Sequence, residues 1–152
     1  MITKAKQRVL IAKDALKWEA AGALRPSETR GYVYPVKSPW PYEDDYKQAR
    51  DVNIGPCHVC ALGGLFVAKA VRYNAVTIRQ LTWGHGGAAT ECLEDHFSIE
   101  QLELIEGCYE IWPWRSEDAL RWGRFNRPER FRRIMKNIIR NKGTFVPSDV
   151  RP

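Results

Sequence analysis

The hydrophobic positions near the N-terminus recur every three or four residues, with lysine and arginine between them. They are Ala5, Val9, Ala12, Leu16 and Ala20. This spacing predicts a helix over about residues 4–21 that buries one stripe of its surface. Gly22 suits the end of this helix, and Pro26 follows shortly afterwards.

A second stretch, from Pro56 to Tyr73, is apolar on nearly every side. Proline suits the first turn of a helix because its missing N–H group is not needed there. A helix that is hydrophobic all round lies inside a protein, surrounded by the other elements. The small residues Gly63 and Gly64 let a neighbouring helix approach closely. The stretch therefore predicts a central helix over about residues 56–73.

Capping signals predict three more helices in the second half of the chain. Ser98 and Gln101 form a capping-box pattern, and Ser116 opens a short helix. Asn126 precedes the last helix, whose apolar side chains keep a helical period until Gly143 ends it. The residues that we expect to be buried together are Cys60, Leu65, Val67, Ala68, Ile105, Ile134 and Ile138.

Residues 25–55 differ from the rest because proline and aromatic residues alternate along them. Residues 31–36 are typical of a short edge strand, since proline is tolerated at sheet edges. The remainder predicts a loop, either a flap that packs on the core or a binding site. A chain of 152 residues has the length of one domain. We therefore predict a single helical domain over residues 1–152, all-α or mainly α, with at most a minor short β-hairpin.

The composition indicates a folded protein and argues against a disordered or a membrane-spanning one. The chain holds 24 Lys and Arg against 18 Asp and Glu, a net charge of +6, and 44% of its residues are hydrophobic, which excludes wholesale disorder. The longest apolar run, Ala61–Ala68, is too short to cross a bilayer, so we expect no membrane partner. Charged residues interrupt the N-terminus before any hydrophobic segment forms. We therefore expect no secretory signal and a cytoplasmic protein.

Four residues have spacings that zinc sites use: Cys57 with Cys60, and Cys92 with His96. The first pair would suit a redox centre if Cys57 lay in a first helical turn, where the helix dipole lowers a thiol pKa. A thioredoxin-like site also needs a βαβ pattern, and none surrounds this pair. Thiols in a reducing compartment more often pack as small apolar side chains. We favour that interpretation and predict no metal ligand, no cofactor and no catalytic residue.

Positive charge gathers near the C-terminus, where residues 115–152 contain eleven Lys and Arg and only four Asp and Glu. The candidate binding residues there are Arg124, Arg130, Arg133, Lys136, Arg140, Trp114 and Trp122. Four of them fall on one side of the last helix, opposite the isoleucine stripe, and we call Arg130, Arg133, Lys136 and Arg140 the basic face. Because of this placement, we expect Arg130, Arg133 and Arg140 to be accessible to solvent. Arginine can form two parallel hydrogen bonds to a phosphate or a carboxylate, and tryptophan stacks on bases. An ordinary solvated helix face would show the same pattern.

Three segments together resemble a family of small uncharacterised bacterial and phage proteins, over about residues 55–147. They are Cys57-x-x-Cys60-Ala61-Leu62-Gly63-Gly64, Phe97-Ser98-x-x-Gln101-Leu102 and Asn137-Ile138-Ile139-x-Asn141-x-Gly143-x-Phe145. The resemblance implies a helical fold, a cytoplasmic setting and a phage origin, and it transfers no catalytic residue.

These observations favour a small non-enzymatic binding protein whose partner is a host or phage protein. The chain itself would then be, for example, a phage-encoded inhibitor or modulator of a host macromolecule. One alternative is a nucleic-acid-binding protein that uses the basic C-terminal helix. Another is a small zinc or thiol enzyme centred on Cys57 and Cys60. The sequence leaves the oligomeric state open.

Overall fold

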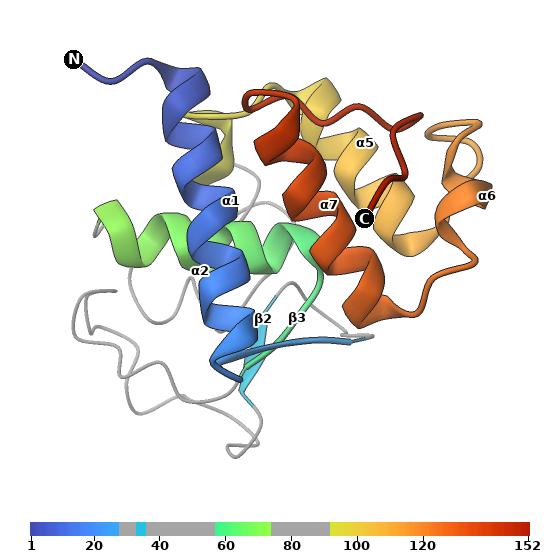
Figure 1. The fold of residues 1–152 in the computed structure, drawn as a ribbon, viewed down its shortest axis with the longest axis horizontal. Coiled ribbons are helices and arrows are strands. Elements are labelled where there is room, and N and C mark those ends of the chain that lie inside the picture. Colours follow the sequence, from blue (N-terminus) through green and yellow to red (C-terminus); the bar gives the residue numbers. More distant parts are fainter. Residues whose placement is uncertain (28–32, 36–56, 74–91) are drawn as a thin grey trace.

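The protein is mainly α-helical in the computed structural model, which describes residues 1–27, 33–35, 57–73 and 92–152 (Figure 1). The helices within these ranges are α1 (Lys4–Ala20), α2 (Ala61–Tyr73), α5 (Ile99–Glu110), α6 (Ala119–Trp122) and α7 (Arg127–Arg140). The strands are β1 (Leu24–Pro26), β2 (Val33–Pro35) and β3 (Cys57–Val59). No helix in these ranges combines the length and the hydrophobicity that crossing a membrane requires.

Helix α2 lies at the centre of the fold, as the sequence predicts. Every residue from Ala61 to Ala70 is buried, and α1 and α5 both pack against the helix. Gly64 faces the ring of Phe131 on α7 so closely that even a Cβ atom would overlap it. Figure 1 shows α1 and α7 running side by side across α2, and the two helices are in contact.

The start of the central helix differs from the prediction. Residues 57–59 form the middle strand of a three-stranded sheet, and the helix begins only at Ala61. This strand pairs in parallel with β1 and antiparallel with β2, and the Cys57 amide donates to the Ala23 carbonyl at 2.8 Å. Neighbouring strands thus supply the hydrogen bonds that a first helical turn would have formed. The predicted short strand over residues 31–36 is confirmed as β2, which lies at one edge of the sheet.

Most of the predicted helix ends are correct. The side chains of Ser98 and Asn126 accept hydrogen bonds from the amides of Gln101 and Glu129, which satisfies the first turns of α5 and α7. The capping box is wrong in one respect, because the Gln101 side chain pairs with the backbone of Phe145 instead. Its Oε1 accepts from the Phe145 amide at 2.6 Å, and its Nε2 donates to the Phe145 carbonyl at 2.9 Å.

One hydrophobic cluster fills the core. It contains all seven residues expected to be buried together, so that prediction is confirmed. The stripe predicted on α1 is only partly right, because the fully buried positions are Ile11, Ala12 and Ala15. Ala5 and Val9 are half-buried and Ala20 is exposed. The fully buried positions thus lie in the middle of α1, a helix that packs on both α2 and α7.

Candidate binding surface

Arg130, which the sequence places on the basic face, is buried. Only 7% of the residue is exposed. Its Nε donates to the Trp122 carbonyl at 3.1 Å, its Nη2 donates to the Phe125 carbonyl at 2.8 Å, and its Nη1 donates to the Tyr109 carbonyl. These carbonyls lie at or just after the ends of α5 and α6, where no later amide of the same helix can reach them. The prediction of a solvent-accessible Arg130 is therefore wrong.

Trp122 is also buried rather than available for stacking on a base. Its indole Nε1 donates to the Pro147 carbonyl at 2.9 Å, and its ring packs against Phe145 and Phe125 with centroids 5.6 and 6.4 Å away. The side chain belongs to the hydrophobic core. Both buried candidates thus hold the fold together at the junction of α5, α6 and α7.

Residues 144–152, which we call the C-terminal strap, engage two further members of the basic face. Arg140 donates two hydrogen bonds to the Asp149 carboxylate, from Nε at 3.0 Å and from Nη2 at 2.9 Å. Arg133 donates to the Val150 carbonyl and to Glu129, each at 2.8 Å, and its guanidinium lies 4.0 Å from the centre of the Phe125 ring. Both arginines are half-buried, so the prediction that they are freely accessible is also wrong.

Asn137 anchors the strap from inside α7. It is fully buried, and its Nδ2 donates to the carbonyls of Val146 and Asp149, both at 2.7 Å. Its Oδ1 accepts from the Val146 amide at 2.9 Å. Around Asp149, the guanidinium groups of Arg151 and then Arg140 hold the pKa of the carboxyl well below its usual range. The strap therefore supplies backbone carbonyls to Arg133 and Asn137, and one carboxylate, that of Asp149, to Arg140.

Three of the seven candidate residues remain exposed: Arg124, Lys136 and Trp114. Trp114 is 75% exposed, and its ring stacks on Trp112 with centroids 5.7 Å apart and planes inclined by 16°. Arg124 lies over the Phe125 ring, 4.8 Å from its centre. Nothing in the described residues joins these three side chains into one pocket.

The cysteine and histidine residues do not assemble a metal site in the described part of the chain, where no three His, Cys, Asp or Glu residues could share an ion. Cys57 lies in a strand, and burial raises the pKa of its thiol, so the predicted lowering by a helix dipole is wrong. Cys60 is buried with its Sγ accepting from the Gly63 amide at 3.3 Å, and burial raises its pKa to about 12. Such thiols are protonated at neutral pH and poorly nucleophilic.

Cys92 and His96 lie near the C-terminal part of α2, beside the buried Lys69. The Lys69 ammonium donates to the Cys92 carbonyl and forms a 3.2 Å ion pair with Asp95. Burial of His96 first, and then the positive charge of Lys69, lower the imidazole pKa to about 4. Most of the predicted aromatic loop lies outside the described residues.

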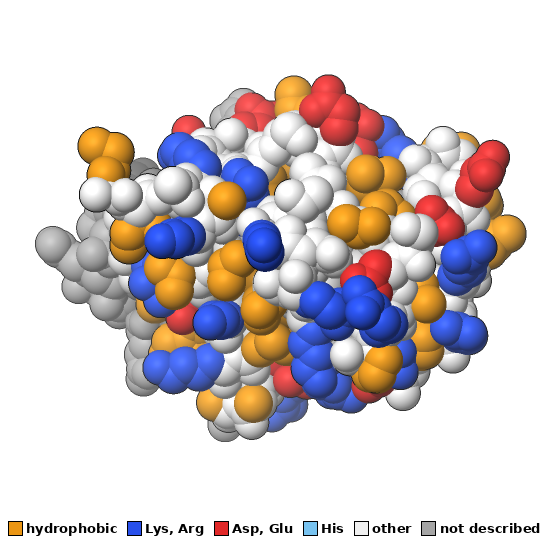
Figure 2. Space-filling model, turned by 45° about the horizontal axis from the view of Figure 1, so that its top comes forward, with side chains coloured by type: hydrophobic (Ala, Val, Ile, Leu, Met, Phe, Trp, Pro, Cys, Tyr) orange, Lys and Arg blue, Asp and Glu red, His pale blue; other side chains and the backbone are white. Residues whose placement is uncertain are grey.

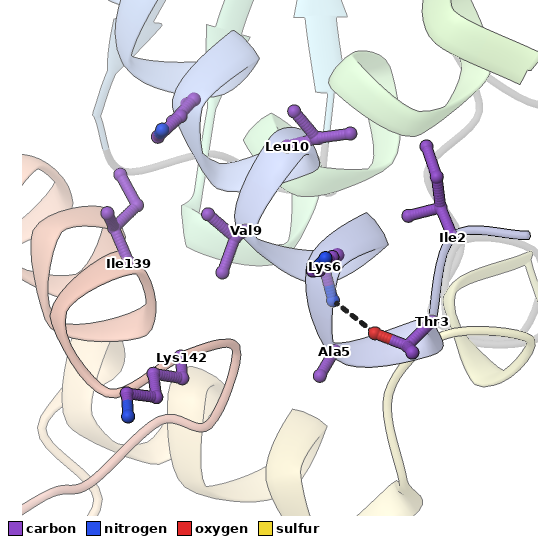
Figure 3. Close-up of a pocket in the computed structure, with 9 residues that line it drawn as sticks. Ile2, Thr3, Ala5, Lys6, Val9, Leu10, Ile139 and Lys142 are labelled. Carbon is purple, nitrogen blue, oxygen red and sulfur yellow. Dashed lines mark hydrogen bonds between the residues drawn. The ribbon is translucent and has the colours of Figure 1, made fainter.

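A groove between α1 and α7 is the surface that sequence reasoning missed (Figure 3). Its volume is about 740 Å³. Its floor is apolar and consists of Ile2, Ala5, Val9, Leu10 and Ile139, and its rim carries Thr3, Lys6, Lys13 and Lys142. We call it the lysine-rimmed groove. Among the described residues, none that lines the groove is acidic, and no carboxylate pairs with any of its three lysines.

Close contact between the two ends of the chain shapes this groove. Gly143 has a φ of 95°, and a Cβ atom there would collide with the backbone carbonyl of Ala5. The Arg8 side chain donates to the Gly143 carbonyl at 2.6 Å, which fixes the turn after α7 against α1. At the start of α1, the Thr3 hydroxyl accepts from the Lys6 amide at 3.3 Å (Figure 3).

The sequence does contain a partial signal for this surface. Ile2 and Leu10 are apolar but fall outside the predicted stripe of α1, so hydrophobic residues cover more of the N-terminal turns than one buried face requires. Lys6 and Lys13 are seven residues apart and so lie on the same side of the helix. The contribution of Ile139 and Lys142 depends on how α7 packs, which local spacing does not reveal.

The apolar floor and the ammonium rim of the groove determine which groups it can bind. In the described part of the chain, the residues that line the groove include no thiol, imidazole or carboxylate that could act as nucleophile or general base. The groove can bury hydrophobic side chains and attract negative charge around them. No protein family, curated protein or solved structure was found to match this chain.

Proposed function

We propose that this chain is a non-enzymatic binding protein that contacts a protein partner through the lysine-rimmed groove. The observation that carries the proposal is the pairing of an open apolar floor with three lysines that have no acidic partner among the described residues. Exposed apolar surface surrounded by polar residues is typical of protein interaction sites. That the partner is a host macromolecule, and that the chain is phage-encoded, remain predictions.

A protein partner suits this groove better than a nucleic acid does. Nucleic-acid sites combine phosphate contacts with aromatic side chains on which bases stack. Among the residues that the structure describes, the lining of the groove contains no aromatic side chain, and its apolar floor contains no side-chain donor to a phosphate. On α7, Arg140 is already paired with Asp149, and Arg133 is already paired with Glu129.

The test compares two double variants with the same change in charge. Lys6→Glu with Lys13→Glu reverses the rim of the groove, whereas Arg124→Glu with Lys136→Glu changes two exposed residues outside it. All four side chains are exposed, so both variants should remain folded. In pull-downs from nuclease-treated lysate, the first variant should lose the protein captured by the wild type, and the second should retain it. Equal capture by both variants would refute the proposal.

Nucleic-acid binding remains a second candidate because of one observation, the exposed Trp114 stacked on Trp112. A base could stack on the free face of this ring. Adding single-stranded DNA should then quench tryptophan fluorescence, and higher salt should weaken that quenching steeply. Trp114→Ala would abolish the effect, while the groove variant would leave it unchanged.

A further inference from the structure

Helix α5 exposes an acidic surface with one hydrophobic side chain at its start. The helix carries four glutamates and no lysine or arginine. Ile99, 52% exposed, is followed by the exposed Glu100 and Glu103. Glu103 forms a 3.1 Å ion pair with Arg115, and its side chain remains 48% exposed. We call Ile99, Glu100 and Glu103 the acidic edge.

The acidic edge and the lysine-rimmed groove are complementary in charge and polarity. Ile99 is an exposed apolar side chain beside carboxylates, and the groove is an open apolar floor beside ammonium groups. From this match we infer that the groove binds the acidic edge of a second copy of this chain. The inference rests on the proposed function, since it takes the groove to be a protein contact surface and names one occupant.

The two surfaces lie near each other, which favours a closed dimer. Gly143 packs against Ala5, which lines the groove. Two residues further along the chain, Phe145 is hydrogen-bonded to Gln101, the neighbour of Glu100 in the acidic edge. Figure 2 shows acidic side chains along the upper edge of a face whose centre and left carry basic and hydrophobic ones. A twofold axis between such neighbouring patches places each acidic edge over the other copy's groove.

Backbone chemistry also favours a helix as the occupant. Extended peptides gain affinity by hydrogen bonding to the free edge of a sheet. The groove is lined by α1, α7 and their ends, and the backbone groups inside a helix are already paired. Most of the lining therefore offers an occupant side chains rather than backbone groups. Helix α5 presents the apolar and acidic side chains of the acidic edge close together at its start. Because the helix is already formed, it loses little conformational entropy on binding.

The experiment measures molar mass by light scattering with chromatography on the full-length chain. The wild type should pass from one to two chains per particle as concentration rises to about 1 mM. Groove variant Lys6→Glu with Lys13→Glu, and edge variant Glu100→Lys with Glu103→Lys, should each stay monomeric. Like charges would then face each other at both contacts, which should weaken self-association more than about 100-fold.

An equimolar mixture of the two variants provides the decisive observation. One contact in the mixed dimer is native, and the other has its charges exchanged, so both are attractive. The mixture should therefore contain dimers although neither variant forms them alone. Circular dichroism checks that each variant is folded. Ile99→Asp, a change at a half-exposed position, gives an independent variant that should also be monomeric if the edge variant unfolds.

The outcomes separate this inference from the proposed function. A wild type that stays monomeric at every concentration, or a mixture that contains only monomers, overturns the inference. If the groove variant nevertheless loses its lysate partner, the proposed function stands with a different occupant. A wild-type dimer that persists in both charge variants places the interface elsewhere and also overturns the inference. Dimers that weaken with added salt support it, because salt screens charges between exposed surfaces.

Discussion

The basic face of α7 and the lysine-rimmed groove are both positively charged, yet the protein uses their charges differently. On the basic face, Arg130 binds backbone carbonyls in the interior, and Arg140 binds Asp149 of the C-terminal strap. At the groove, Lys6 and Lys13 are exposed and pair with no carboxylate among the described residues. The comparison shows that the number of basic residues on a helix does not identify a binding surface. What matters is whether the fold already supplies partners for them.

The largest effect should come from Arg130, because its replacement by methionine removes the guanidinium donors to the carbonyls of Tyr109, Phe125 and Trp122. Of these three carbonyls, that of Trp122 keeps one other donor, the Phe125 amide. Each unsatisfied buried group costs about 1–3 kcal/mol, so the free energy of unfolding should fall by about 3–5 kcal/mol. Urea denaturation measures this change. The matched control, Arg124→Met, is exposed and should shift stability by less than about 0.5 kcal/mol. Equal stability of the two variants would show that Arg130 is a surface residue after all.

Asn137→Ala should have the next largest effect, because it removes every side-chain hydrogen bond between α7 and Val146. We expect a loss of about 2–3 kcal/mol, since buried backbone groups of the strap lose their partners. Hydrogen exchange should then report faster exchange at the amides of Val146 and Asp149, with little change in α2. Uniformly faster exchange throughout the protein would mean that the strap does not open separately.

Asp149→Asn tests the electrostatic part of the comparison through its dependence on pH. The pKa of Asp149 is lowered in the folded state, so its charge stabilises the protein above the unfolded pKa of about 3.9. The variant should be about 1–2 kcal/mol less stable at pH 7. This difference in stability should shrink as the pH falls below about 4, because protonation of Asp149 then removes the charge that stabilises the wild type. Parallel stability curves from pH 7 to pH 2 would contradict the assignment.

The smallest effect on stability is expected at the groove. Lys6→Glu with Lys13→Glu should change the free energy of unfolding by less than about 0.5 kcal/mol, because neither side chain has an ion-pair partner to lose. Thermal melts of this variant and the wild type should therefore coincide to within a few degrees. A large loss would mean that these lysines stabilise the fold, which would remove the contrast between the two surfaces.

Local signals in the sequence predicted much of the fold. Asn126 and Ser98 cap their helices through contacts only three residues away, so nearby residues suffice to identify them. The burial of α2 also follows from its own composition. In contrast, the strand at Cys57 depends on pairing with residues 24–26, more than thirty positions earlier. Such non-local hydrogen bonds leave no periodic signal in the strand itself.

The candidate site was harder to predict for the same reason. Arg130 has helical spacing that suits an exposed face, and only the carbonyls at the ends of other elements make a buried guanidinium favourable there. The partner of Gln101 is Phe145, forty-four residues away. The groove requires α1 and α7, the first and last helices, to meet. Sequence periodicity describes each helix separately and contains no information on that encounter.

The hydrogen bond from Arg8 to Gly143 also has a consequence for biosynthesis, because it joins residues 135 positions apart. Ribosomes add about 5–20 residues per second, so the first helix emerges roughly ten seconds before its partner α7 exists. During that interval, the α1 positions that contact α7 have no such partner to cover them. Final docking of α1 against α7 therefore has to follow the translation of α7, and until then this part of the α1 surface is open to chaperones and proteases.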